Sequence, residues 1–307
     1  MLTEQGLLTR SPGHRAYTTS SLTSVLSIGI LAGFREEPFA RMIILEGMKE
    51  AIASKRFGFS TFAGPATELD SYLDSEPMNG AEPLGGLILL PPSNVDRARL
   101  REFRRKRPIV LIDQMIPGFE ADFVGFQDFE AGYDAARHLY ELGHRRIAFL
   151  GNEVPGTARD RRRGVEAFCQ DAGIEATWNF SGLTNGSGVP DGYLQSVFGL
   201  VRQAWPTAAV CSNDETAAKM IVGLGRLGIK VPGDLALVGF GNADTSLLSA
   251  LDLSTMAQPY VDVGREALNL IAGRIRGTLT GDPKEIRLPM HFVRRGSCGA
   301  AISSTAA

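Results

Sequence analysis

Short apolar runs rich in valine, isoleucine and leucine alternate along the chain with longer segments of mixed polarity. The runs at 25–32 and 86–90 have the length of buried strands. The segments at 40–55 and 129–143 repeat apolar residues at the spacing of a helix. This alternation predicts β-α-β units, in which parallel strands form a sheet covered by helices. A second series of the same kind at 157–241 predicts a second lobe, so the expected fold class is α/β with two doubly wound parallel sheets.

Glycines stand where two of the predicted helices should end. Gly143 and Gly228 each follow a helical segment, so we expect both to end a helix and Gly143 to adopt the left-handed conformation. The sequence G-x-G-x-x-G at 223–228 therefore lies at the end of a helix. A dinucleotide loop needs that motif at the start of a helix, where backbone amides face the pyrophosphate, so we do not expect a nucleotide there.

Composition narrows the class of protein. The 307 residues include 32 Lys and Arg against 34 Asp and Glu, so the chain has no broad positive field and any nucleic-acid contact must be local. Three cysteines, Cys169, Cys211 and Cys298, form no C-x-x-C pair, which favours a reducing compartment. The sequence shows no secretory signal and no run of 18 apolar residues. We therefore expect a cytoplasmic protein without a membrane span.

Signatures of catalysis are absent from the sequence. The four histidines, His14, His138, His144 and His291, have no metal-binding spacing, and no G-x-S-x-G nucleophile elbow occurs. We therefore expect a chain that is not an enzyme and that holds neither a metal nor a cofactor.

Polar side chains follow several predicted strands. Open α/β sheets bind ligands at the carboxyl ends of their strands, and Asp113, Asp128, Asn213, Asp214 and Asn242 occupy such positions. Capping of the next helix is the commoner role for each residue alone. As a set, they predict a site for a small polar molecule.

Four arginines, at 159, 161, 162 and 163, crowd the start of one predicted helix, where positive charge opposes the helix dipole. Most should lie on a solvated face. One or two could instead grip hydroxyls or a carboxylate of a ligand with the guanidinium fork.

Three long segments resemble the effector domain of LacI-family transcription regulators: HLYELGHRRIAFLGN, RRRGVEAFCQDAGI and AVCSNDETAAKMIVGLGRLGIKVPGDLALVGFGNADTSLL. The resemblance runs from about 23 to 298. It implies the periplasmic-binding-protein type I fold, with two lobes joined by three crossovers, the ligand between them, and a homodimer. The expected N-lobe spans about 23–143 and 259–284, and the expected C-lobe about 144–258 and 285–307.

The resemblance also assigns ligand contacts. It implies that Arg161, three residues before Gly164, grips the effector, that Asn213 and Asp214 contact it, and that Phe39 stacks on it. One departure concerns the strand end V-G-F-D-D of the family, which reads Val238-Gly239-Phe240-Gly241-Asn242 here. Either Asn242 or Asp244 replaces the missing carboxylate, or the effector is not a simple neutral sugar and an acidic ligand is favoured.

The N-terminal LTEQGLLTRSPGHRAYT resembles the end of a GntR-type winged helix. Residues 1–22 would then be a remnant of a DNA-binding domain and linker, with Arg10, His14 and Arg15 as wing residues on DNA phosphates and the recognition helix upstream of Leu2. The alternative for this segment is an unrelated tail.

Two functions remain open on the sequence. The first is a ligand-responsive bacterial transcription regulator whose core binds a small polar metabolite, such as a sugar or sugar acid, and controls binding to operator DNA by a complete DNA-binding head. The alternative is a solute-binding receptor of a transporter with the same fold, against which the missing signal peptide and the wing-like start argue. An enzyme on the same scaffold is the least favoured interpretation.

Overall fold

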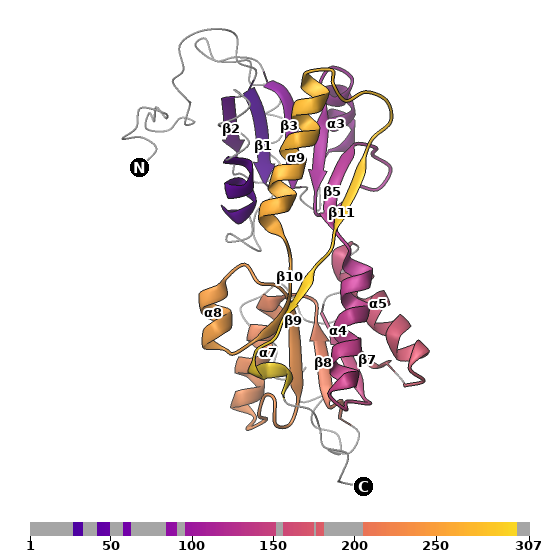
Figure 1. Ribbon diagram of the computed structural model, residues 1–307, viewed down its shortest axis with the longest axis vertical. Coiled ribbons are helices and arrows are strands. Elements are labelled where there is room, and N and C mark those ends of the chain that lie inside the picture. The colour runs from indigo at the N-terminus through magenta and orange to yellow at the C-terminus, as the bar shows by residue number, and fades with distance from the viewer. Residues whose placement is uncertain are drawn as a thin grey trace, which may run out of the picture. The chain divides into compact units, whose positions relative to one another are not determined.

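A computed structural model describes residues 27–32, 42–49, 58–62, 84–90, 96–151, 156–174, 176–180 and 205–299. The chain divides into two compact units, seen in Figure 1. Unit 1 comprises residues 1–125 and 260–288, and unit 2 comprises residues 126–259 and 289–307. Each unit contains one six-stranded sheet, so the predicted α/β fold with two doubly wound sheets is confirmed.

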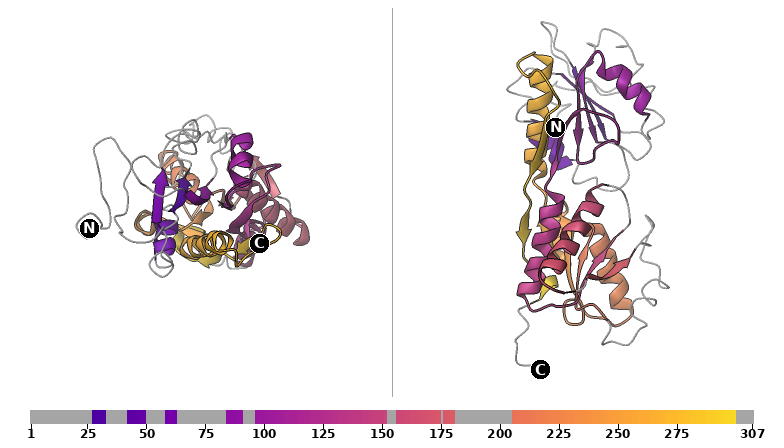
Figure 2. Two further views of the ribbon diagram at one scale, coloured as in Figure 1. Left: turned by 90° about the horizontal axis from the view of Figure 1, so that it is seen from above. Right: turned by 90° about the vertical axis from the view of Figure 1, so that its right-hand side faces the viewer.

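The sheet of unit 1 has the strand order β11-β5-β4-β3-β1-β2. Its strands are β1 (Ser27–Ala32), β2 (Gly58–Phe62), β3 (Leu84–Leu90), β4 (Ile109–Ile112), β5 (Asp122–Phe126) and β11 (Glu285–Leu288). The strands from β1 to β5 pair in parallel. The helices α3 (Arg97–Arg104) and α9 (Tyr260–Ile275) lie on opposite faces of this sheet, as Figure 2 shows from the side. A further helical segment covers 42–49.

The sheet of unit 2 has the strand order β12-β10-β9-β8-β6-β7 and is parallel except for the edge strand β12. Its strands are β6 (Ile147–Leu150), β7 (Ala176–Phe180), β8 (Ala208–Cys211), β9 (Ala236–Gly241), β10 (Ser254–Ala257) and β12 (His291–Val293). Its helices are α4 (Asp128–Glu141), α5 (Thr157–Asp171), α7 (Asp214–Arg226) and α8 (Thr245–Ala250), followed by the 3-10 turn η3 (Gly296–Cys298).

Successive residues of the strands in unit 2 contribute to two separate cores. Ile147 and Phe149 of β6 pack with α4 and α5 on one face, whereas Ala148 and Leu150 pack with α7 on the other. Side chains of a strand alternate between the two faces of its sheet, so an all-apolar strand requires helices on both sides. The unbroken apolar runs of the sequence thus have a direct structural cause.

The helix α4 belongs to unit 2, which corrects the lobe boundary expected at 143. The chain enters unit 2 after Gly125, because α4 packs tightly against α5. A Cβ on Gly132 would lie 2.0 Å from the carbonyl oxygen of Arg161, and a Cβ on Gly164 would lie 2.0 Å from that of Phe129. The strand-helix alternation does not reveal this contact. The later crossings, before Tyr260 and after Leu288, lie close to those expected at 259 and 284.

The helix ends agree with the glycine prediction. Gly143 has a φ of 101° and Gly228 a φ of 73°, and each follows a helix. Because α7 ends at Arg226, the G-x-G-x-x-G sequence lies at its carboxyl end, as expected. Cys169, Cys211 and Cys298 are buried and carry free thiols. In the ranges that the structure describes, no helix combines the length and the apolar character needed to cross a membrane.

Candidate functional site

The carboxyl edge of the unit 2 sheet carries most of the predicted ligand residues. The strand β8 ends at Cys211 and is followed by Ser212, Asn213 and Asp214, and β9 is followed by Asn242. Parallel strands of one sheet end at the same edge, so these residues share one rim of unit 2. Asp128 and Arg161 reach the same rim from the starts of α4 and α5.

Arg161 is a buried cation with three kinds of partner. Its Nε donates to Oδ1 of Asp128 at 2.8 Å, and its Nη1 donates to the carbonyl oxygen of Ser212 at 2.7 Å. The guanidinium carbon lies 4.7 Å from the centre of the Phe240 ring. Arg161 is 5% exposed and Asp128 is 3% exposed. A buried charge is tolerated only when it is paired and hydrogen-bonded, and here both conditions hold.

Close helix packing brings this pair together. Asp128 is the first residue of α4, and Arg161 lies in the second turn of α5. The reciprocal contacts of Gly132 and Gly164 place the two helices nearer than residues with a Cβ would allow. The guanidinium is thereby held at a fixed position beside the end of β8. Such a fixed donor plane suits hydroxyl or carboxylate oxygens.

Asp214 links three elements of unit 2. Its Oδ1 accepts from Oγ1 of Thr255 at 2.6 Å, and its Oδ2 accepts from the backbone N–H of Asn242 at 2.6 Å. Gly239 makes room for the carboxylate, because a Cβ there would lie 2.2 Å from Oδ1. Burial raises the pKa of Asp214, although the hydrogen bonds from Thr255 and Asn242 act in the opposite direction. Its carboxylate therefore ties the start of α7 to β9 and β10.

Asn242 is fixed on both its backbone and its side chain. It has a φ of 62°, and its Oδ1 accepts from Nη2 of Arg295 at 2.9 Å. Arg295 also donates from Nη1 to the carbonyl oxygen of Leu253 at 2.7 Å. The preceding Gly241 has a φ of 138°, a conformation that residues with a Cβ rarely adopt. The departure from the V-G-F-D-D pattern thus coincides with a backbone shape that favours glycine.

The side chain of Asn213 has two polar groups, of which the oxygen caps a helix and the nitrogen can donate to a ligand. Its Oδ1 accepts from the backbone N–H of Thr216 at 2.8 Å and caps α7. Its amide nitrogen makes no hydrogen bond to the described part of the chain. Asn213 therefore presents a donor at the rim while its carbonyl oxygen is occupied.

The structure brings five of the seven predicted ligand residues to this rim: Asp128, Arg161, Asn213, Asp214 and Asn242. Asp113 belongs to unit 1 instead, where it follows β4 with a φ of 68° and donates its N–H to the carbonyl oxygen of Val124. Phe39, together with the wing residues Arg10, His14 and Arg15, lies outside the described residues.

The other three arginines at the start of α5 and the possible metal ligands were also subjects of prediction. Arg159 and Arg163 are exposed and make ion pairs with Asp160, which agrees with a solvated face for these two, whereas Arg162 is partly buried and pairs with Glu166. Within the described ranges, no three His, Cys, Asp or Glu side chains cluster in a way that could hold a metal ion.

Sequence reasoning missed Arg295 and Thr255 as parts of the rim. Arg295 reaches Asn242 across 53 residues of sequence, and Thr255 reaches Asp214 across 41. Pairing of β10 with β9 and β12 creates both contacts. The sequence does show two consecutive arginines after β12, but it does not show which residue either of them contacts.

Comparison with known proteins agrees with this architecture. Residues 136–298 match the family of periplasmic binding protein-like domains. The chain is 34% identical over 170 residues to the HTH-type transcriptional repressor PurR of Haemophilus influenzae, which covers 55% of this chain and 50% of the repressor. It is 29% identical over 221 residues to the HTH-type transcriptional repressor CytR of Escherichia coli K12, with 71% of this chain and 63% of the repressor covered.

A solved structure extends the similarity over both units. A LacI family transcriptional regulator from Enterococcus faecium with bound ribose superposes with a TM-score of 0.72 at 25% identity, covering 90% of this chain and all of that one. The chain spans about half the length of the PurR repressor that it matches. These named relatives are regulators and not enzymes, in agreement with the expectation from the sequence. The chain therefore belongs to the family of periplasmic binding protein-like domains, and it resembles a LacI family regulator over most of its length.

Proposed function

We propose that the chain is the ligand-binding core of a cytoplasmic transcription regulator, which binds a small polar metabolite at the rim of unit 2 and thereby controls binding to operator DNA. Arg161 is the observation that carries the proposal. It is held at the rim by Asp128, Ser212 and Phe240, so its position is fixed before any ligand arrives. A preorganised guanidinium loses little conformational freedom on binding.

Two donors and two carboxylates of the rim define the chemistry of the ligand. Arg161 and the amide nitrogen of Asn213 are donors, and both carboxylates nearby already accept hydrogen bonds from the protein. Asp128 is paired with Arg161, and both oxygens of Asp214 accept hydrogen bonds from the protein. Gly241 supplies no side chain. A rim dominated by donors favours a ligand rich in acceptor oxygens, such as a sugar acid, over a neutral sugar that needs carboxylate acceptors.

The DNA-binding role rests on the relatives named as repressors and on the wing-like sequence at 1–22. We propose that a complete head reads operator DNA and that the protein acts as a homodimer, since dimers place two heads on a symmetric site. Ligand binding would change the relative population of two conformations, of which one binds operator. The alternative, a transporter receptor, would bind the same class of ligand without any DNA.

The proposal is tested by a thermal-shift screen of the purified chain against ribose, cellobiose, gluconate, galacturonate and nucleosides. A rise in melting temperature that saturates with one of these ligands supports the ligand-binding role, and a preference for an acid over its parent sugar supports the donor-rich rim. Operator binding by the protein with its complete head, altered by the same ligand, separates a regulator from a transport receptor. No shift with any polar metabolite would contradict the proposal.

A further inference from the structure

A cavity lies in unit 1, at the edge of the sheet where the strands begin. It has a volume of about 400 Å³, and its lining includes Ile109 and Asp122, the first residues of β4 and β5. Asp113, a predicted ligand residue of this unit, follows the opposite end of β4. At about 3.3 Å per residue, that end lies on the order of 13 Å away. The cavity is therefore separate from the edge where open α/β sheets bind their ligands.

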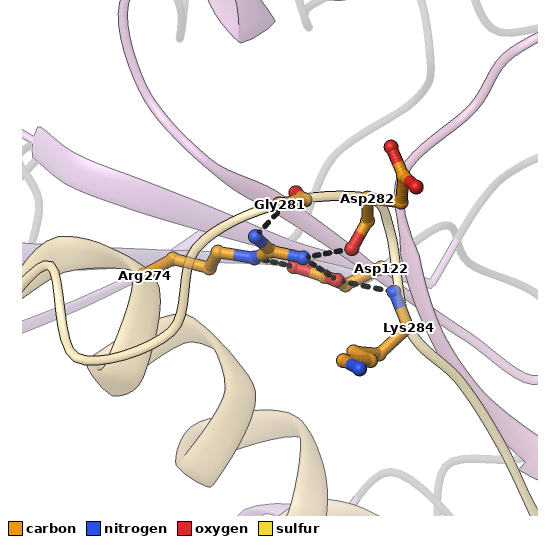
Figure 3. Close-up of polar contacts among 5 residues, drawn as sticks. All are labelled: Asp122, Arg274, Gly281, Asp282 and Lys284. Carbon is orange, nitrogen blue, oxygen red and sulfur yellow. Dashed lines mark hydrogen bonds and ion pairs between the residues drawn. The ribbon is translucent and has the colours of Figure 1, made fainter.

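Part of the cavity lining is an ion pair between Arg274 of α9 and Asp122 of β5. Nε and Nη2 of Arg274 donate to the two carboxylate oxygens of Asp122, each at 2.8 Å, as Figure 3 shows. The backbone N–H of Lys284 donates to the same carboxylate at 2.7 Å. Arg274 is further held by the carbonyl oxygens of Gly281 and Asp282, at 2.8 and 2.6 Å. The charge of Asp122 is thus neutralised, and it does not repel an incoming anion.

Three more arginines line the cavity, Arg101 and Arg104 from the last turn of α3 and Arg105 directly after it. Arg101 donates from Nη2 to the carbonyl oxygen of Gly118 at 2.8 Å. Arg104 and Arg105 are exposed and make no ion pair or hydrogen bond through their side chains within the described residues. The lining therefore has four guanidinium groups and one carboxylate, a formal excess of three positive charges.

The carboxyl end of a helix favours nearby cations, which explains part of this cluster but not its size. Two unpaired guanidinium groups on neighbouring residues repel each other unless an anion lies between them. The lining also has an apolar part, formed by Pro108, Ile109 and Pro283. Cavities of this volume and mixed lining suit small organic ligands.

We propose that this cavity binds a small phosphate monoester. Arg104 and Arg105 would hold the phosphate through forked charge-assisted hydrogen bonds, the geometry in which arginine binds phosphate best. Pro108 and Pro283 would contact the carbon skeleton. The site provides unit 1 with a ligand of its own, independent of the molecule bound at the rim of unit 2.

Isothermal titration calorimetry with glycerol 3-phosphate at constant ionic strength tests the proposal, with glycerol as the uncharged control. The wild-type chain should give saturable binding to the ester and none to glycerol. The double variant Arg104→Ser/Arg105→Ser should lose about tenfold or more in affinity, as expected when hydrogen bonds to a charged group are removed. Arg104→Lys should lose part of the affinity, because it keeps the charge but not the fork.

Lys106→Ser is the matched control. Lys106 is exposed, adjoins Arg105 and does not line the cavity, so its replacement removes one positive charge from the same helix end. The affinity of the Lys106→Ser variant for the ester should stay within about twofold of that of the wild type. Equal losses in Lys106→Ser and in the double variant would overturn the site in favour of a diffuse charge effect. No saturable binding by a folded wild-type chain, or equal affinity for inorganic phosphate and the ester, would also overturn the proposal.

Discussion

Arg161 and Asp128 form a buried ion pair that joins α5 to α4, with 2.8 Å between Nε and Oδ1. Burial of both charges costs solvation free energy, which offsets most of their attraction. The pair therefore adds little net stability, and its main effect is to hold the guanidinium in place. Arg161 could serve a ligand only if Asp128 keeps it in place.

Removal of Asp128 should therefore be costly. Asp128→Ala leaves the Arg161 charge buried without its carboxylate, and we expect the free energy of unfolding to fall by about 3–5 kcal/mol in urea denaturation. Asp160→Ala is the control, because the partly buried Asp160 pairs only with the exposed Arg159 and Arg163 among the described residues. It should cost less than about 1 kcal/mol. Similar losses in the two variants would contradict the structural role of the buried pair.

The close approach of α4 and α5 gives a second prediction. Gly164→Ala would place a methyl group 2.0 Å from the carbonyl oxygen of Phe129, so the helices must separate. We expect a loss of at least about 2 kcal/mol in the free energy of unfolding, as for other overpacked sites. Gly225→Ala in α7 meets no atom within 4 Å and should instead stabilise the chain by about 0.5–1 kcal/mol. Urea denaturation of the two variants measures the contrast, and equal effects would refute the helix contact.

His144 should make stability depend on pH. Burial lowers the pKa of His144 to about 4, from an ordinary value of 6.5, and Nδ1 lies 3.0 Å from Oγ1 of Thr207. The unfolded chain therefore binds a proton on this residue between about pH 4 and 6.5 while the folded chain does not, so stability falls as the pH falls through this range. The expected contribution is about 1–3 kcal/mol.

His144→Asn tests this dependence, because asparagine can still bond to Thr207 but does not titrate. Urea denaturation midpoints measured between pH 4.5 and 7 should vary less in the variant than in the wild type. An unchanged pH dependence would show that other groups cause it.

Gly241 provides a test of the strand end that departs from the family pattern. Gly241 has a φ of 138°, so any residue with a Cβ at this position would strain the backbone. Gly241→Asp, which restores the carboxylate, should lower the free energy of unfolding by about 1–3 kcal/mol, and Gly241→Ala should cost a similar amount because the backbone strain is shared. Thermal or urea denaturation of both variants checks this. If the aspartate variant is as stable as wild type, the backbone at 241 accommodates the carboxylate.

The fold was predictable because its strands are short and apolar on both faces, and because glycines mark the helix ends. Side chains of β6 alternate between two cores, with Ile147 in one and Ala148 in the other. Because both faces are buried, the strand is visible in the sequence as an unbroken apolar run. The boundary at Gly125 was not visible, since it depends on the contact between Gly164 and the backbone of Phe129.

The candidate site was predictable where residues directly follow strands, as Asn213 and Asn242 do. Contacts between distant segments were not, because the sequence does not state which strand pairs with which. Arg295 and Thr255 join the rim only through the order of β9, β10 and β12.

The most direct test of the proposed ligand site is the affinity of Asn213→Ser for the ligand that gives the largest shift in the thermal screen. Serine keeps the cap of α7 but removes the amide donor of Asn213. Isothermal titration calorimetry should show about tenfold weaker binding with an unchanged melting temperature of the free protein. Asp96→Ser, at the cap of α3 in unit 1, should bind as wild type does. Wild-type affinity in Asn213→Ser would contradict the assignment of the rim of unit 2 as the ligand site.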